Sequence, residues 1–330
     1  METGGTITTK ERLLALLEAN KGIYFSGQEL GQKLNLSRAA VWKAIGLLRQ
    51  EGYPIHAVTN RGYCLSEETD ILSAPGVEKY LHSQESFTVE VVPSTVSTNA
   101  LARQRAQEGA PEGYVLISNA QTGGRGRYGR TFYSPEGTGI YLSLLLRPRP
   151  VSAQQNLPLT AVAAVALCRA IQVAGGGAAQ IKWVNDIFLN GKKVCGILTE
   201  GAYDMESGTL ETAIVGVGIN LYPPREGFPE ELASIAGAIF DAPVNDGKNR
   251  LAAAFLEYFW NCYTGKDEYL EEYRQRSLVL GKQVTVFLGG TERQAQALGI
   301  DDACHLLVRY GDGQSQTLSS GEVSITLPKT

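Results

Sequence analysis

Three short amphipathic segments with capping residues at their ends open the chain. They cover residues 9–20, 28–34 and 37–50. Ser26 and Ser37 stand where helix N-caps are expected, and Asn35-Leu36 leaves only a tight turn before the third segment. Two helices joined by such a turn predict a helix-turn-helix, and this motif sets the fold of the first 66 residues.

Two β-like runs, residues 55–58 and 62–65, follow and are joined at Asn60-Arg61, which predicts the hairpin of a winged variant. In such motifs the start of the second helix meets base edges, and basic residues contact phosphates. The candidate DNA contacts are Ser37, Arg38, Ala39, Trp42, Lys43 and Arg61. The alternative is a small helical domain for protein contact or dimerisation, and a Trp on a helix is more often a core residue.

The net charge of −4 conceals an asymmetry along the chain. Residues 1–66 hold eight basic and five acidic residues, which leaves 22 of the 30 basic and 29 of the 34 acidic residues for the remainder. A basic head on an acidic body fits DNA binding by the head alone. It argues against a protein that coats nucleic acid.

Several classes of protein are excluded by simple counts. The longest purely apolar run, residues 161–168, is far shorter than the ~20 residues of a membrane span. Lys10, Glu11 and Arg12 precede the first apolar stretch, so no signal peptide is expected. The five cysteines form no C-x-x-C pair, which argues against disulfides and a cysteine zinc site. We expect a cytoplasmic protein with no membrane contact.

Beyond a polar linker, the pattern of predicted secondary structure changes twice along the sequence. Strand-like and helical segments alternate over residues 67–278, which predicts a mixed α/β domain. From residue 279 to 330 short β runs with glycine-rich turns predict a small all-β barrel. With residues 1–66, this gives three domains, consistent with a length of 330 residues.

Residues 121–130 hold four glycines and three arginines. Glycine lets the backbone approach an anion closely, and arginine supplies bidentate donors. The spacing Gly124-x-Gly126-x-x-Gly129 matches the dinucleotide fingerprint, but a loop and strand follow where that motif requires a helix, so an NAD oxidoreductase is rejected. No Walker sequence is present. A solvated turn is the alternative to an anion site.

A second cluster lies around Asn190-Gly191, a strong hairpin signal. A single strand over residues 180–189 would pair Leu189 with Lys192, Phe188 with Lys193 and Asp186 with Cys195. Alternation then places Lys182, Asp186 and Lys193 on one face, where they suit a phosphate, a metal or an amine. A solvated outer face is the alternative. Asn185 would lie on the opposite face, and a catalytic role for it would require a bulge.

Taken together, these motifs resemble the biotin–protein ligases of the bifunctional class, which also repress biotin-biosynthesis genes. The resemblance spans almost the whole chain, and its motifs are the winged helix, Ser97-Thr98-Asn99, residues 121–130, residues 182–186, residues 191–198 and Gly218-Ile219-Asn220. It implies an α+β multidomain fold: an N-terminal winged helix-turn-helix, a central mixed α/β catalytic domain of the biotin/lipoate ligase type, and a C-terminal SH3-like β-barrel.

The resemblance also implies the reaction and the site. Biotin's carboxylate attacks the α-phosphate of ATP, with Mg²⁺, to give biotinyl-5′-AMP, and a lysine of the biotin carboxyl carrier protein of acetyl-CoA carboxylase then accepts the biotin. The implied catalytic residues are Lys193, Arg127 and Asp186. The implied biotin-binding residues are Ser97, Thr98, Asn99, Gln121, Arg125, Gly126, Arg127 and Lys193. The implied nucleotide-binding residues are Arg127, Arg130, Phe132, Lys182, Asn185 and Asn220.

Two positions depart from the family pattern. Val184 stands where proline is usual, and Phe132 stands where a tryptophan that stacks on the adenylate is common. We therefore expect altered adenine packing. The resemblance further implies a homodimer formed with biotinyl-5′-AMP on operator DNA. Two rivals stay open, a lipoate–protein ligase and a non-catalytic ligand-sensing regulator. The metal ligands are not assigned.

Overall fold

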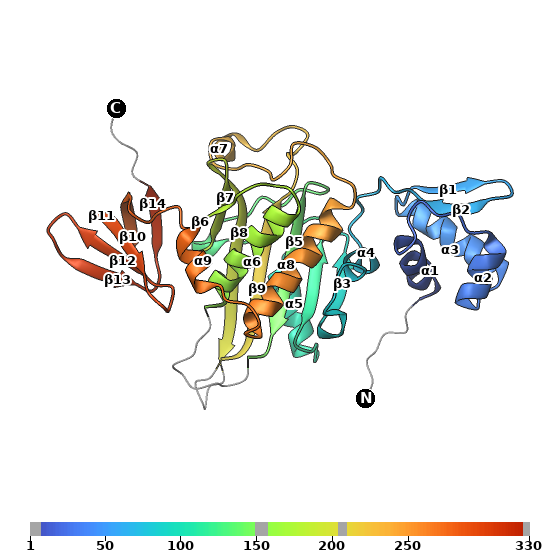
Figure 1. The fold of residues 1–330 in the computed structure, drawn as a ribbon, viewed down its shortest axis with the longest axis horizontal. Coiled ribbons are helices and arrows are strands. Elements are labelled where there is room, and N and C mark those ends of the chain that lie inside the picture. Colours follow the sequence, from blue (N-terminus) through green and yellow to red (C-terminus); the bar gives the residue numbers. More distant parts are fainter. Residues whose placement is uncertain (1–7, 149–157, 204–209, 326–330) are drawn as a thin grey trace. The chain divides into compact units, whose positions relative to one another are not determined.

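The computed structural model describes residues 8–148, 158–203 and 210–325 (Figure 1). The chain divides into two compact units, residues 1–81 with 243–253 and residues 82–242 with 254–330. The domain boundaries expected after residues 66 and 278 stay predictions. In the described part of the chain, no helix combines the length and apolar character that a membrane span requires.

The first unit contains the helix-turn-helix. Its helices are α1 (Thr9–Glu18), α2 (Gly27–Leu34) and α3 (Arg38–Gln50), and its hairpin pairs β1 (Ile55–Val58) with β2 (Gly62–Leu65). Ser26 and Ser37 accept hydrogen bonds from the backbone as N-caps, and Asn35 ends α2 with a left-handed backbone at φ 54°. Leucines from the three helices form the core. The predicted caps and hairpin are confirmed.

A buried network of four charged side chains ties α1 to two later segments of the same unit. Lys79 follows α4 (Ala74–Glu78), and Asp246 directly precedes α8 (Gly247–Tyr263). The Lys79 ammonium lies 2.8 Å from Glu18 and 2.6 Å from Asp246, and the Lys21 ammonium lies 2.9 Å from Asp246. None of the four side chains is more than 16% exposed. Residues 243–253 therefore belong structurally with the helix-turn-helix.

Replacing Asp246 by alanine should destabilise the first unit by about 3 kcal/mol, because it leaves two buried lysines without this carboxylate. Hydrogen exchange of the α1 amides measures the loss as a lower opening free energy. The control is Asp312→Ala, which removes a 58% exposed carboxylate paired with Arg293 and should change little. Unchanged α1 protection in Asp246→Ala would contradict the prediction.

The same carboxyl predicts how stability depends on pH. Burial alone would raise the pKa of Asp246, but hydrogen bonds from Asn249, Lys79, Tyr80 and Lys21 together lower this pKa to about 2. A folded-state pKa below the ordinary value near 3.8 stabilises the folded state above pH ~4, by about 2 kcal/mol. This contribution is lost as pH falls from ~4 through 2. In Asp246→Asn the decline of α1 protection over that window should be shallower.

The second unit is built on a seven-stranded sheet with the order β3-β4-β5-β9-β8-β7-β6. Its strands are β3 (Thr88–Val92), β4 (Tyr114–Ser118), β5 (Gly139–Leu146), β6 (Gln180–Lys182), β7 (Asp186–Leu189), β8 (Lys192–Tyr203) and β9 (Leu210–Asn220). Only the β3–β4 pairing is parallel. Helix α5 (Thr98–Gln107) packs on β4, β5 and β9, while α6 (Leu159–Val173) packs on β6 to β9.

Residues 254–263 of α8, two further short helices and a second sheet complete this unit. The helices are α7 (Glu230–Ala233) and α9 (Leu270–Gln275). The sheet is antiparallel, with β10 (Gln283–Leu288), β11 (Thr291–Ile300), β12 (Leu306–Tyr310), β13 (Ser315–Leu318) and β14 (Glu322–Ile325). The predicted β-rich tail is confirmed, but within the described residues its end strands β13 and β14 do not pair, so the sheet is open. The closed SH3-like barrel stays a prediction.

Candidate active site

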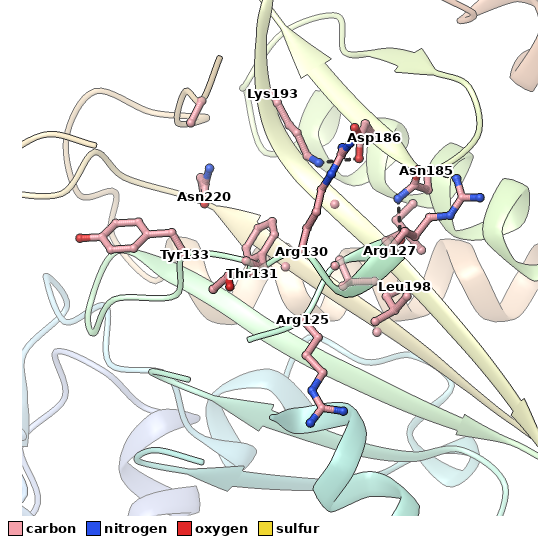
Figure 2. Close-up of a pocket in the computed structure, with 18 of the residues that line it drawn as sticks. Arg125, Arg127, Arg130, Thr131, Tyr133, Asn185, Asp186, Lys193, Leu198 and Asn220 are labelled. Carbon is pink, nitrogen blue, oxygen red and sulfur yellow. Dashed lines mark hydrogen bonds and ion pairs between the residues drawn. The ribbon is translucent and has the colours of Figure 1, made fainter. Parts of the chain in front are cut away.

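A cavity of about 530 Å³ lies in the second unit and collects the predicted ligand-binding residues (Figure 2). Its lining includes Ser97, Thr98, Asn99, Gln121, Arg125, Gly126, Arg127, Arg130, Phe132, Lys182, Asn185, Asp186, Lys193 and Asn220. These residues come from motifs up to 123 positions apart, between residues 97 and 220. A volume of roughly 300–1,000 Å³ is typical of small-molecule and cofactor pockets.

Three glycines of neighbouring strands form the floor of this cavity. Gly196 of β8 pairs with Gly218 of β9, and Gly216 lies two positions earlier on the same face. A Cβ at Gly218 would overlap the Phe132 ring, and a Cβ at Gly216 would overlap Asn99. Any larger residue here would displace side chains of the cavity. The sequence of residues 214–220 predicts a strand whose glycines permit close approach of a ligand, and alternation along β9 places Gly216 and Gly218 on one face.

The glycine-arginine loop, residues 121–130, forms a narrow turn above this floor. Arg125 and Thr131 form an isolated antiparallel β-bridge through their backbones. The Gly126 amide donates to the Arg130 carbonyl at 2.7 Å, and the Phe132 amide donates to the Gly124 carbonyl at 2.9 Å. A single 3-10 turn at residues 127–129 closes the tip. Strand β5 follows, so the expectation that no helix begins after this loop is confirmed.

The three arginines of the loop point in different directions. Arg127 donates to Asn185 Oδ1 at 3.3 Å, and Arg130 lies 2.7 Å from Glu322 on β14. The hydrogen bond and charge of Glu322 raise the pKa of Arg130. Figure 2 shows the Arg125 guanidinium directed away from Lys193 and Asp186. The loop therefore offers cationic groups to more than one part of a long ligand.

Lys193 and Asp186 form an ion pair at 2.6 Å between Nζ and Oδ1. The predicted register holds next to the turn, because Leu189 pairs with Lys192 and Phe188 with Lys193. The predicted register is wrong farther from the turn, because a bulge makes Asp186 pair with Gly196 instead of Cys195. The shared cavity of Lys182, Asp186 and Lys193 survives this shift. Local turn chemistry fixed the hairpin but carried no signal for the bulge.

The single strand expected over residues 180–189 is also wrong. It divides into β6 and β7, which pair with each other through a turn at residues 183–185. Asn185 thus reaches the cavity from a turn and needs no bulge. Its Nδ2 donates to the Ile197 carbonyl at 2.9 Å, which orients its Oδ1 toward Arg127. Lys182 lies 5.8 Å from the Phe188 ring.

A chain of hydrogen bonds fixes the small polar residues at the start of α5. The Thr98 amide donates to Gln121 Oε1 at 2.8 Å, and Gln121 Nε2 donates to Ser134 at 3.1 Å. Asn99 is 5% exposed and Ser97 is 4% exposed. Ser97 precedes α5 but makes no side-chain cap hydrogen bond. Ser97 therefore lines the cavity instead of serving as an ordinary helix cap.

Two parts of the cavity wall were not foreseen. Phe228, Leu232, Ile235 and Ala236 form an apolar side, and Glu322 with Val323 adds part of β14. The segment that carries the apolar side is held beside β8 and β9. The Lys193 amide donates to the Ile235 carbonyl at 2.8 Å, and Asn220 Nδ2 donates to the Gly237 carbonyl at 3.1 Å. These contacts join distant stretches of chain, so no local pattern marks them.

The proposed DNA-contacting side chains of the first unit are exposed. Trp42 is 71% exposed on α3, with Ala39 and Lys43 on the same helix also exposed. The structure thus places Trp42 outside the core. Arg38 donates to Gln28 at 2.8 Å, Ser37 caps α3, and the Arg61 guanidinium stacks 4.2 Å above the Tyr24 ring. These positions suit base and phosphate contacts.

The residues that the structure describes contain no group of three or more His, Cys, Asp or Glu that could hold a metal. The carboxylates that line the cavity are Asp186 and Glu322. Mg²⁺ usually binds through one or two carboxylates together with substrate phosphates. Asp186 fits that requirement, while a metal site made by protein side chains alone does not fit the residues present.

Comparison with known families and proteins matches each part of this architecture. Residues 9–64 match the HTH domain, residues 89–220 match the Biotin/lipoate A/B protein ligase family, and residues 279–325 match the Biotin protein ligase C terminal domain. The fold is shared with a biotin protein ligase from Aquifex aeolicus in complex with biotin and ATP, at 25% identity and a TM-score of 0.57. That match covers 72% of this chain and 98% of the other.

Similarity to whole proteins is closer still. The chain is 34% identical over 326 residues to a bifunctional ligase/repressor BirA of Bacillus spizizenii, covering 95% of this chain and 98% of the relative. It is 32% identical over 329 residues to the protein of that name in Escherichia coli, covering 96% and 97%. The fold and cavity thus define a ligase of the biotin/lipoate class that carries a helix-turn-helix domain. This chain belongs to the bifunctional biotin ligase/repressor family.

Proposed function

We propose that this chain is an ATP-dependent biotin–protein ligase that also represses biotin-biosynthesis genes. The observation that carries the proposal is a single cavity in which Lys182, Lys193 and three arginines surround a floor of glycines. The glycines leave room for the Phe132 ring and the Asn99 side chain to lie against the strands, and the cations suit a carboxylate next to a phosphate. Biotin and ATP supply those two groups.

The first step joins biotin to AMP. A carboxylate is already ionised at neutral pH and needs no general base, so the step depends on positioning and on neutralising phosphate charge. Biotin's carboxylate oxygen attacks the α-phosphorus, the bond to the β-phosphate oxygen breaks, and pyrophosphate leaves. Lys193 bridges the biotin carboxyl and the α-phosphate, with Asp186 orienting its ammonium from 2.6 Å. Arg127 and Arg130 face the phosphates.

The remaining residues hold the two ends of the adenylate. Ser97, Thr98, Asn99 and Gln121 surround the biotin ring, and Arg125 with the Gly126 amide closes the loop over it. Phe132 packs against adenine, and its ring lies on the glycine floor beside Tyr141, with centroids 6.5 Å apart. Lys182, Asn185 and Asn220 border the nucleotide. Asp186 is the carboxylate that would hold Mg²⁺ together with the ATP phosphates, whose negative charge the ion would help to neutralise.

The second step and the repressor activity involve macromolecular partners. The amine of a lysine on a biotin carboxyl carrier protein of acetyl-CoA carboxylase attacks the mixed anhydride, forms the amide and releases AMP. The helix-turn-helix binds operator DNA through exposed residues of α3 and through Arg61. Two chains carrying biotinyl-5′-AMP form the dimer that reads the operator. The C-terminal sheet is completed as an SH3-like barrel.

One experiment tests the ligase. The protein is incubated with labelled biotin, ATP and a carrier domain, and pyrophosphate release and labelled carrier are measured. Lipoate in place of biotin is the matched arm, because a lipoate ligase would share the catalytic fold. Faster turnover with lipoate, or no pyrophosphate with either acid, would contradict the proposal. The second result would favour a non-catalytic sensor.

Replacing Gly216 by alanine should weaken biotin use about tenfold. The new Cβ would overlap Asn99 Oδ1, so the Asn99 amide must turn and lose hydrogen bonds worth roughly 1–2 kcal/mol in total. The KM for biotin in the pyrophosphate assay measures the loss. Gly311→Ala is the control, since its Cβ meets open space. An unchanged KM for biotin in Gly216→Ala would contradict the prediction.

A further inference from the structure

The Asn99 side chain is tightly constrained behind the cavity wall. Its Nδ2 donates to Glu200 Oε2 at 2.7 Å and to the Leu198 carbonyl at 3.2 Å. Its Oδ1 accepts a hydrogen bond from Ser143 Oγ at 2.6 Å. Glu200 is in turn paired with Arg103 of α5 at 2.8 Å, and Glu200 does not line the cavity.

These partners decide which way the amide faces. The two ends of an asparagine amide are similar in shape, so hydrogen-bond partners determine the orientation. A main-chain carbonyl and a carboxylate paired with arginine both accept hydrogen bonds, so the nitrogen must face Leu198 and Glu200. Both Asn99 donors are then used. Its oxygen keeps one lone pair after Ser143, so Asn99 offers the cavity an acceptor and no donor.

We propose that Glu200 is a positioning residue that holds Asn99 with its carbonyl oxygen toward the substrate, where it accepts a hydrogen bond from an N–H of a cyclic urea. This inference rests on the proposed function, in which biotin is the substrate. Without Glu200 the amide loses its 2.7 Å hydrogen bond, and only the contacts with Leu198 and Ser143 hold its orientation. Whenever the less firmly held amide rotates, it presents N–H groups to a urea N–H, and two donors cannot bond to each other.

The test compares Glu200→Leu with Glu200→Gln in the full-length protein. Leucine removes the acceptor, so the KM for biotin should rise about tenfold, while kcat and the KM for ATP stay within about twofold. Glutamine keeps an acceptor oxygen, so Glu200→Gln should retain a KM for biotin within about threefold of the unchanged protein. The unchanged protein should prefer biotin over biotin methylated on a urea nitrogen, because methylation removes the N–H that Asn99 accepts. The ratio of the two activities should be smaller in Glu200→Leu.

Glu90→Leu is the matched control. Glu90 pairs at 3.0 Å with Arg105, which lies on α5 as Arg103 does. The Glu90 side chain is 32% exposed, and that of Glu200 is 33% exposed. Its loss should leave the KM for biotin unchanged, and thermal melting of all variants checks folding. A normal KM for biotin in Glu200→Leu, or equal losses in the leucine and glutamine variants, would overturn the positioning role while the ligase stands. An unmodified protein that releases no pyrophosphate with biotin would overturn the proposed function itself.

Discussion

Lys193→Ala should slow formation of biotinyl-5′-AMP by about 10²–10³-fold, the scale for losing one preorganised electrostatic group. The lysine is 29% exposed, paired with Asp186 at 2.6 Å, and its main chain is held on both sides by the segment at residues 235–237. A charge fixed in this way needs little reorganisation as negative charge builds up on the phosphate. The effect should therefore appear in kcat for pyrophosphate release.

The variants must separate loss of charge from loss of fold. Lys193→Ala leaves the Asp186 carboxylate without its partner, so thermal melting accompanies the kinetics. Lys266→Ala removes an exposed lysine of the same unit and should retain full activity. Arg127→Ala should show a loss of similar size, because Arg127 is the proposed phosphate contact oriented by Asn185. Near-normal pyrophosphate release in Lys193→Ala would remove this lysine from the mechanism.

The parts of the fold that were predictable from sequence are those fixed by contacts between near neighbours. Helix α3 and the β1–β2 hairpin appear with the predicted bounds, because Ser37, Gln50 and the Asn60 turn define them locally. The cap at Ser26 is confirmed for the same reason. Side-chain to backbone hydrogen bonds within three or four residues leave a readable pattern in the sequence.

The missed features depend on contacts between distant segments. Residues 180–189 alternate in a way that predicts one strand, but a turn at residues 183–185 divides them into two. A bulge opposite Ile187 then shifts the pairing of β7 with β8. Strand β13 has a polar sequence and gains strand geometry only by pairing with β12. The attachment of residues 243–253 to the helix-turn-helix rests on Asp246, whose two lysine partners lie more than 160 positions away.

The candidate site was more predictable than the strand register around it. Every expected ligand residue lines one cavity, because the motifs themselves mark where backbone approaches a ligand. What the motifs could not give is the layer behind them. Glu200 contacts Asn99 across 101 positions, and Glu322 contacts Arg130 across 192. Carboxylates of this kind look like solvated surface residues in a sequence.

Biotinyl-5′-AMP should convert this chain from a weak monomeric DNA binder into a dimer that binds its operator at least ~10³-fold more tightly than unrelated DNA. A single winged helix offers few base contacts, and specific affinity usually comes from two half-sites read by a symmetric pair. Residues 1–66 are basic. The rest of the chain holds 29 of the 34 acidic residues but only 22 of the 30 basic residues. That excess opposes approach to phosphate, so the monomer should bind weakly, and the affinity that its basic residues provide should fall as salt rises.

The ligand can drive assembly only by binding the dimer more tightly than the monomer. We expect residues 123–130 of the glycine-arginine loop to supply that difference by ordering around the adenylate, provided that the loop borders the subunit contact. Coupling of roughly 1–3 kcal/mol is typical for such linkage and would tighten association about 5–150-fold. Abundant unmodified carrier protein should relieve repression, because transfer of biotin consumes the adenylate.

Sedimentation and DNA binding test this coupling in three states: without ligand, with biotin alone and with biotinyl-5′-AMP. The operator probe is DNA selected from a random pool by the adenylate-bound protein, and a scrambled duplex is its control. Lys43→Ala should weaken binding to both duplexes while leaving dimerisation intact, because Lys43 is an exposed residue of α3. Equal association and equal DNA affinity in all three states would defeat the corepressor role. The ligase assignment would stand, since the cavity and its cations lie in the second unit.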